Sequence, residues 1–252
     1  MGHRRGILAL KGASFSYGPD AFGIGPMDVA LHEGEMVGLL GANGSGKSTI
    51  LKLMGGLLKP DAGGVDLWGQ PIASMRNRDR AKLVSYLPQV LDMNVPFTVG
   101  QLAGMGLYPY ERGAGMGVDE ALGLVGLADR SGDALSRLSG GQRRRAYIAM
   151  TLVQGAGILL LDEPLANLDV RYQVETIRLL RDLNEKRGMA IMMALHDISL
   201  AHRFDALVLL HHGRVIARGT PETVLREDLL REAFETDIDV RRLADGRLAI
   251  YY

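Results

Sequence analysis

The chain has 252 residues, of which 47% are hydrophobic, and its 29 basic and 29 acidic side chains balance. This balance gives no reason to expect bulk attraction to nucleic acid or to an anionic membrane. The absence of cysteine excludes disulfides, thiolate catalysis and cysteine-based zinc or iron–sulfur sites. No apolar run approaches the roughly 18 residues that span a bilayer.

The first elements in chain order are predicted to be strands. Residues 7–17, 27–31 and 35–40 have the composition of strands, and the last of these runs directly into the glycine-rich stretch GANGSGKST. From Lys47 onward, the spacing of apolar residues predicts a helix that ends near Gly55. The beginning of the chain therefore has the order strand, loop and helix.

The middle of the chain differs from its flanks. Residues 98–138 contain several glycines and short helical patterns but few β-branched runs, which indicates a helical subdomain inserted into a larger α/β unit. We expect one domain over residues 1–252, with an α/β core formed by residues 1–97 and 139–252. After residue 139, apolar strands alternate with helices, which predicts a mostly parallel sheet preceded by an antiparallel N-terminal part.

The stretch from Gly41 to Ser48 matches the phosphate-loop pattern G-x-x-x-x-G-K-[ST] between a strand and a helix. Glycines let successive backbone N–H groups turn inward around an anion, and the start of the helix adds its positive dipole end. The Lys47 ammonium is expected to reach the β- and γ-phosphates, and the Ser48 hydroxyl to ligate Mg²⁺. A nucleoside triphosphate is therefore expected here, but kinases, GTPases, helicases and transporter ATPases all remain open.

Two acids follow four apolar residues in the stretch ILLLDE, which ends at Glu163. A buried strand delivers both carboxylates to its carboxyl end, where open α/β sheets bind ligands. We expect Asp162 to orient Mg²⁺ through a water molecule, and Glu163 to act as general base on the attacking water.

The stretch LSGGQ, residues 138–142, follows the helical segment. By itself it is also consistent with a simple helix cap at Ser139. Together with the phosphate loop and the Asp-Glu pair, it resembles the signature of the ATP-binding cassette (ABC) ATPase family, and the resemblance covers nearly the whole chain. In that family, two chains stack head to tail, and each signature closes on the nucleotide of its partner. The resemblance implies such a contact for Ser139, Gly140, Gly141 and Gln142, together with Asp169 in LANLD.

Further residues take their expected roles from this resemblance. Gln89 in YLPQ matches the glutamine that contacts Mg²⁺, His196 in LHD matches the histidine that contacts the γ-phosphate, and Tyr17 in FSYG matches the aromatic residue that stacks on adenine. The catalytic set is then Glu163, His196, Gln89 and Lys47, with Ser48, Gln89 and Asp162 around the metal. The nucleotide-binding residues are Tyr17, Gly41, Ala42, Asn43, Gly44, Ser45, Gly46, Lys47, Ser48 and Thr49.

Finer features resemble the ATPases of iron-siderophore, haem and vitamin B12 importers, among them VPFTVGQL and Leu107-Tyr108-Pro109-Tyr110. This implies an ATPase, with ATP and Mg²⁺ as cofactors, that lies at the cytoplasmic face of the membrane. Its implied partners are a second copy of itself, transmembrane permease subunits and, indirectly, a substrate-binding protein, but no nucleic acid. Departures occur at Leu107, where relatives commonly have arginine, and at Ala166-Asn167.

Three alternatives stay open. In the first, the same ATPase serves another ABC transporter, either a metal-ion importer or an exporter. In the second, the chain is a soluble ABC module without a transport role. A small-molecule kinase is the third, although LSGGQ argues against it. Two further clusters are interpreted as structural: the arginines Arg143-Arg144-Arg145 as a solvated helix face, and His211-His212 as a turn pair rather than a metal site, since neighbouring strand residues point to opposite faces.

Overall fold

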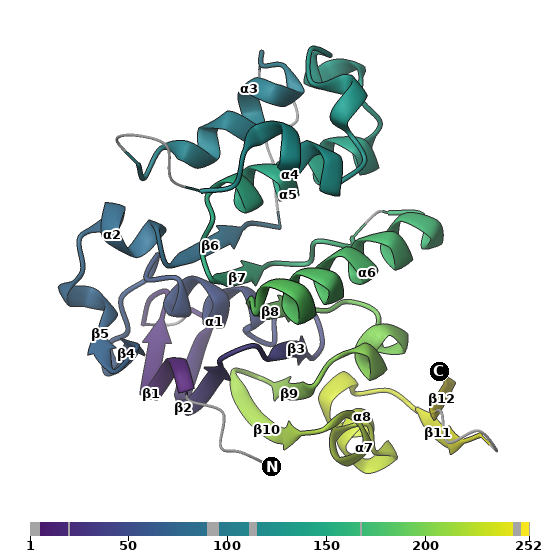
Figure 1. The fold of residues 1–252 in the computed structure, drawn as a ribbon. Coiled ribbons are helices and arrows are strands. Elements are labelled where there is room, and N and C mark those ends of the chain that lie inside the picture. Colours follow the sequence, from purple (N-terminus) through teal and green to yellow (C-terminus); the bar gives the residue numbers. More distant parts are fainter. Residues whose placement is uncertain are drawn as a thin grey trace. The chain divides into compact units, whose positions relative to one another are not determined.

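The computed structural model describes residues 6–19, 21–89, 96–110, 115–166, 168–243 and 248–251. The chain divides into two compact units. The first unit is formed by Met1–Ala73 and Met192–Tyr252, and the second by Ser74–Ile191. Figure 1 shows the elements of both units with the labels used below. Our finer division into an α/β core and a helical subdomain over residues 98–138 stays a prediction.

The first unit begins with an antiparallel sheet whose strand order is β2-β1-β4-β5. Strand β1 spans Gly6–Ser16, β2 spans Gly23–His32, β4 spans Ala62–Leu67 and β5 spans Gln70–Pro71. In β2, buried and more exposed residues alternate over most of the strand, as expected for a strand with one face on the core and one toward solvent. The predicted antiparallel N-terminal part is thus confirmed, although β2 begins four residues before the predicted strand.

A parallel pair of strands forms the other layer of strands in the first unit. Strand β3 (Met36–Leu40) runs parallel to β9 (Ala206–His211), and β9 forms an antiparallel hairpin with β10 (Arg214–Gly219). All five residues of β3 are buried, which explains its continuous apolar sequence. Strand β3 leads into helix α1 (Lys47–Met54), so the predicted order of strand, loop and helix is confirmed.

The C-terminal part of the first unit is a series of short elements. It contains the 3₁₀ helix η5 (Ile198–Arg203), helices α7 (Pro221–Val224) and α8 (Glu227–Phe234), and the antiparallel pair β11 (Asp239–Arg242) and β12 (Leu248–Tyr251). Helix α8 packs against β9 and β10. This contact brings the end of α8 to the hairpin that lies beside the phosphate loop.

The second unit combines a parallel strand pair with helices. Strand β6 (Val84–Leu87) runs parallel to β7 (Ile158–Leu161). Helix α5 (Gly140–Val153) contacts α3 (Val99–Gly104) and α4 (Val118–Leu124). The long helix α6 (Val170–Arg187) precedes β8 (Ala190–Ala194), in which the chain passes from the second unit into the first. The remaining elements are α2 (Asn77–Ala81) and the 3₁₀ helices η1 (Ile72–Ser74), η2 (Met105–Leu107), η3 (Ala128–Arg130) and η4 (Leu135–Arg137).

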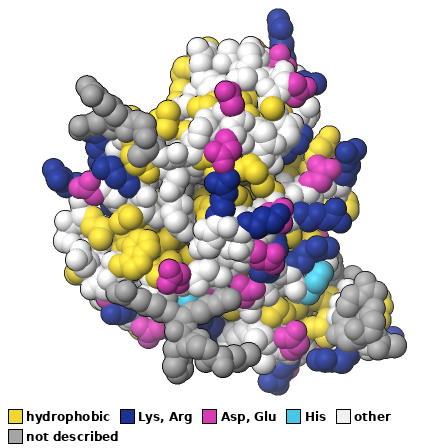
Figure 2. All heavy atoms as spheres, in the orientation of Figure 1, with side chains coloured by type: hydrophobic (Ala, Val, Ile, Leu, Met, Phe, Trp, Pro, Cys, Tyr) yellow, Lys and Arg dark blue, Asp and Glu magenta, His cyan; other side chains and the backbone are white. Residues whose placement is uncertain are grey.

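The surface carries charges of both signs. On the face that Figure 2 shows, Lys and Arg side chains lie interspersed with Asp and Glu side chains, in agreement with the balanced charge of the sequence. Within the described residues, every helix is too short or too polar to cross a bilayer.

Candidate nucleotide site

The phosphate loop connects β3 to α1 in the first unit. Gly41 and Gly46 are buried, whereas Asn43 and Gly44 are exposed at the tip of the loop. Gly41 has a φ of 146°, and a Cβ atom placed on it would lie 2.4 Å from the carbonyl oxygen of Leu210. Glycine is therefore required at this position both by the backbone conformation and by the close approach of β9.

Lys47 opens helix α1 and is buried, with its ammonium group held by the loop itself. The Nζ atom donates hydrogen bonds to the carbonyl oxygens of Gly41 at 2.7 Å and Ala42 at 3.1 Å. In the same loop, the hydroxyl oxygen of Ser45 is buried and makes no hydrogen bond within the described residues. A buried cation and a buried hydroxyl beside a helix N-terminus form a set of donors that fits a phosphate group.

The hairpin of β9 and β10 supports this loop from the side. The Gly213 N–H donates to the carbonyl oxygen of Ser45 at 3.1 Å, and the Gly213 carbonyl oxygen accepts from the Gly25 N–H at 3.0 Å. The turn of the hairpin thus connects β2 with the phosphate loop. Motions of this turn are expected to be transmitted to the loop.

Two more of the predicted residues lie in the first unit. Tyr17 follows β1 with 52% of its surface exposed, and its hydroxyl lies 3.3 Å from the Thr49 hydroxyl on α1. The phenol ring is therefore available beside the phosphate loop. His196 follows the end of β8 and is exposed.

The second unit contains the acidic pair. Asp162 and Glu163 follow β7, and both are buried. The Tyr86 hydroxyl donates to Oδ2 of Asp162 at 3.2 Å, and Nε2 of Gln89 donates to Oε2 of Glu163 at 2.8 Å. Glu163 also has a φ of 47°, an uncommon backbone conformation for a residue with a side chain. Such strain is concentrated at functional sites.

The backbone of this acidic pair is held by an arginine that was expected on a solvated helix face. Arg144 on α5 is buried, and its Nη2 atom donates to the carbonyl oxygens of both Asp162 and Glu163. Burial lowers the pKa of Arg144, and the nearby carboxylates of Glu163 and Asp162 oppose that shift. The interpretation of Arg143-Arg144-Arg145 as a solvated face is therefore wrong for Arg144. Charge patterns on a helix do not reveal which arginine faces the neighbouring strand.

The signature stretch lies at the N-terminus of α5. Ser139 is the N-cap residue: its hydroxyl accepts a hydrogen bond from the Gln142 N–H at 3.3 Å, while its own N–H donates to the Gln142 side-chain oxygen at 3.0 Å. This reciprocal pair is a capping box. Ser139 and Gly140 are exposed, as is Asp169 at the start of α6, so these groups are accessible to a second chain.

The predicted residues are thus distributed over both units. The first contains the phosphate loop from Gly41 to Thr49, Tyr17 and His196, and the second contains Gln89, Asp162, Glu163, the signature and Asp169. Within the first unit the structure brings Tyr17 to α1, and within the second it brings Gln89 to Glu163. Of the two departures, Asn167 lies outside the described residues, and Leu107 is partly exposed at the end of η2.

Comparisons with known proteins identify the family of the chain. Residues 24–166 match the family model described as ABC transporter. The petrobactin import ATP-binding protein YclP of Bacillus subtilis (strain 168) is 34% identical over 98% of this chain and 100% of the relative. The hemin import ATP-binding protein HmuV of Rhodopseudomonas palustris (strain BisB18) is 38% identical over 96% of this chain and 93% of the relative.

A solved structure has the same fold. A dimeric ATP-binding cassette in a post-hydrolysis state, bound to ADP and Pi, is 26% identical and has a TM-score of 0.76 over 85% of this chain and 99% of that chain. The resemblance to the ATPases of siderophore and haem importers is thereby confirmed. The chain belongs to the ABC transporter family, as one of its ATP-binding, ATP-hydrolysing subunits.

Proposed function

We propose that the chain hydrolyses ATP to power an ABC importer of the kind that takes up iron-siderophore, haem or cobalamin. The observation that carries the proposal is the glycine-lined loop in front of α1, with Lys47 buried within it. The two relatives serve import of petrobactin and of hemin, which supports the direction of transport and the class of cargo.

In this proposal the phosphate loop binds the triphosphate and Tyr17 stacks on the adenine. The Lys47 ammonium exchanges its loop carbonyl partners for phosphate oxygens, and the N–H groups of the first turn of α1 complete the anion site. Ser48, Gln89 and Asp162 offer only oxygen ligands, the donor set that Mg²⁺ prefers. When bound, Mg²⁺ neutralises the charge that develops on the transferred phosphoryl group.

Glu163 is the proposed general base for the attacking water. Its burial and its hydrogen bond from Gln89 fix one carboxylate oxygen, while the other oxygen remains to accept a proton. Lys47 and His196 are the proposed stabilisers of charge on the γ-phosphate. Support for a common role of the two units comes from the family, in which these motifs follow one another in the same order.

The signature is proposed to act on the nucleotide of a second copy. The exposed Ser139 hydroxyl, the N–H groups that follow it and Asp169 would close over the partner's triphosphate in a head-to-tail dimer. The dimeric cassette with a TM-score of 0.76 supports this assembly. Binding of two nucleotides then closes the dimer, and hydrolysis reopens it.

The remaining partners follow from the same proposal. Transmembrane permease subunits would dock on the ATPase at the cytoplasmic face of the membrane and convert its closure into alternating access. A substrate-binding protein would deliver the cargo to the permease. The partly exposed Leu107 and the 86% exposed Tyr108 offer apolar surface for a permease contact.

The proposal is tested by capturing the tagged chain from gently solubilised native membranes and identifying what accompanies it. A many-helix permease in a two-to-two complex is expected. The complex, reconstituted in vesicles, should then be assayed for ATP-dependent uptake of ferric siderophores, haem and cobalamin.

Each alternative predicts a different outcome. Uptake of a bare metal ion would indicate a metal-ion importer, and outward transport would indicate an exporter. A soluble partner without any permease would remove the transport role altogether. A kinase would transfer the phosphoryl group to a small-molecule acceptor and would release no phosphate when the acceptor is absent.

A further inference from the structure

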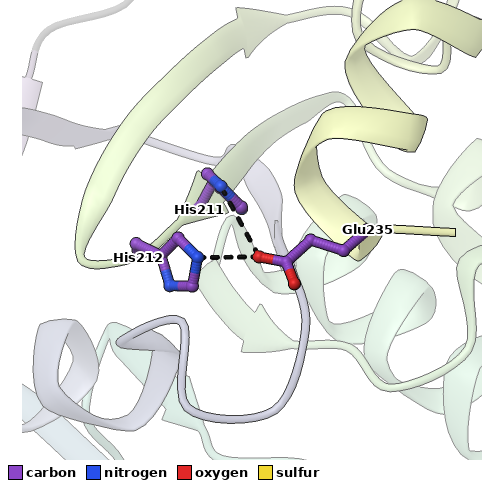
Figure 3. A group of neighbouring side chains, drawn as sticks. All are labelled: His211, His212 and Glu235. Atoms are coloured by element: carbon purple, nitrogen blue, oxygen red, sulfur yellow. Dashed lines mark ion pairs between the residues drawn. The ribbon is translucent and has the colours of Figure 1, made fainter.

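Three side chains that the nucleotide chemistry does not use meet beside the β9–β10 hairpin. His211 is the last residue of β9, His212 is the first residue of the two-residue turn, and Glu235 directly follows α8. Figure 3 shows the Glu235 carboxylate directed toward both imidazole rings. The cluster thus joins two segments that are separated by more than twenty residues of sequence.

The backbone explains why two neighbouring histidines face the same side. His212 has a φ of 43° and Gly213 a φ of 73°, so the hairpin turns with two left-handed residues. His212 therefore does not follow the alternation of side chains along a strand, and the two ring centroids lie 4.1 Å apart. The prediction of a turn pair is correct, but the expected divergence of the two side chains is wrong.

The ligand atoms are close enough to share one ion. Nε2 of His212 lies 2.7 Å from Oε1 of Glu235, and Nε2 of His211 lies 3.9 Å from the same oxygen. One ligand atom from each residue can be chosen so that all lie within 4.8 Å of one another. In a tetrahedral zinc site with bonds of about 2.1 Å, ligand atoms are roughly 3.4 Å apart. To reach that spacing, the His212–Glu235 pair must lengthen by about 0.7 Å and the His211–Glu235 pair must shorten by about 0.5 Å. The two imidazole nitrogens, at most 4.8 Å apart, must approach by up to about 1.4 Å, which rotation of the exposed His212 side chain can provide.

We propose that His211, His212 and Glu235 form a site for a divalent transition-metal ion such as Zn²⁺. The two imidazole nitrogens are borderline ligands, which favour zinc and its neighbours over Mg²⁺ or Ca²⁺, and zinc also accepts a carboxylate oxygen as a ligand. Three protein ligands leave a fourth position for water. His212 and Glu235 are largely exposed, so an ion has direct access from solvent.

The ion would fasten the end of α8 to the hairpin turn. Gly213, the next residue after His212, donates its N–H to the Ser45 carbonyl oxygen at 3.1 Å. An ion that holds the turn in place would therefore also limit the movement of the phosphate loop. This consequence rests on the proposed nucleotide role of that loop: metal and ATP would change each other's affinity by the same factor.

The site itself is tested without nucleotide. The untagged full-length chain, freed of metal with a chelator, is titrated with Zn²⁺ by calorimetry, and its thermal unfolding is followed at saturating Zn²⁺. One ion per chain is expected at this cluster, with a rise in Tm of about 5 °C when free Zn²⁺ is a hundredfold above Kd. Mg²⁺ at the same concentration should not produce this rise.

Variants assign the binding to the cluster. The variants are His212→Asn and Glu235→Asn. Asparagine tolerates the left-handed backbone conformation of both positions, so both variants should fold. Each should bind Zn²⁺ at least about tenfold more weakly than the wild type. The matched control is His202→Asn, which removes an exposed histidine from η5 and should keep the wild-type affinity.

The outcomes separate the site from its consequence. Zn²⁺ affinity that is unchanged in both cluster variants, or that falls equally in His202→Asn, overturns the site and leaves an ion pair of His212 with Glu235. If the site is present, Zn²⁺ should shift ATP affinity in the wild type but not in His212→Asn. An ATP affinity that is the same with and without Zn²⁺ would overturn the coupling. An absence of ATP binding would overturn the proposed function instead.

Discussion

The Gln89 side chain donates a hydrogen bond from Nε2 to Oε2 of Glu163 over 2.8 Å. This contact links a loop residue after β6 to the second residue after β7, 74 positions later in the sequence. It orients the carboxylate that we propose as general base.

Replacing Glu163 with Gln should abolish ATP hydrolysis while ATP binding is retained. The amide has almost the same volume and still accepts the bond from Gln89, but it has no basic oxygen to take a proton. Phosphate release should fall by at least about a hundredfold, whereas the affinity for a fluorescent ATP analogue should stay near the wild-type value. Glu175→Gln on α6 is the matched control. Full hydrolysis by the Glu163 variant would rule out its role as base.

Replacing Arg144 with Met should destabilise the second unit and slow hydrolysis. The change leaves the carbonyl oxygens of Asp162 and Glu163 without their guanidinium donor. We expect a loss of about 3 kcal/mol in the free energy of unfolding, measured in urea.

The exposed Arg178 on α6 provides the control for this experiment, since Arg178→Met should change stability by no more than about 0.5 kcal/mol. Equal stability of the Arg144 variant and the wild type would mean that the acidic pair needs no support from α5.

Two substitutions of Ser139 separate helix capping from a contact with the partner's nucleotide. Ser139→Ala removes the acceptor for the Gln142 N–H and should cost about 1 kcal/mol in stability. Ser139→Asp restores a capping oxygen but places a negative charge where a phosphate is expected. We therefore expect the Asp variant to be stable and yet defective in ATP-dependent dimerisation, measured by light scattering in the Glu163→Gln background. Normal dimerisation of the Asp variant would leave Ser139 with a capping role alone.

Two glycines with positive φ should respond differently to alanine. At Gly34 a Cβ atom meets nothing within 4 Å, so Gly34→Ala should cost only the conformational strain of about 1 kcal/mol. At Gly41 the Cβ atom would also collide with the Leu210 carbonyl oxygen, so Gly41→Ala should cost about 3 kcal/mol and abolish nucleotide binding. Urea unfolding and ATP-analogue fluorescence measure both effects. Similar losses in the two variants would contradict the clash at Gly41.

The sequence alone determined the features whose physics is local. The spacing of glycines, Lys47 and Ser48 defines a phosphate loop because those residues act on their own backbone and on the helix that follows. Four apolar residues before Asp162 predict a buried strand with acids at its end. Ser139 and Gln142 lie three residues apart, the separation of a capping box, although only the structure identifies its two hydrogen bonds.

Only the tertiary structure decided which distant residues meet. Arg144 is one of three consecutive arginines, and the packing of α5 alone selects it for burial against the acidic pair. Gly213 bonds to Ser45 across 168 positions of sequence, and Glu235 reaches two histidines more than twenty residues earlier. These contacts depend on how separate elements pack and on the left-handed turn at His212, and neither is encoded in the spacing of neighbouring residues.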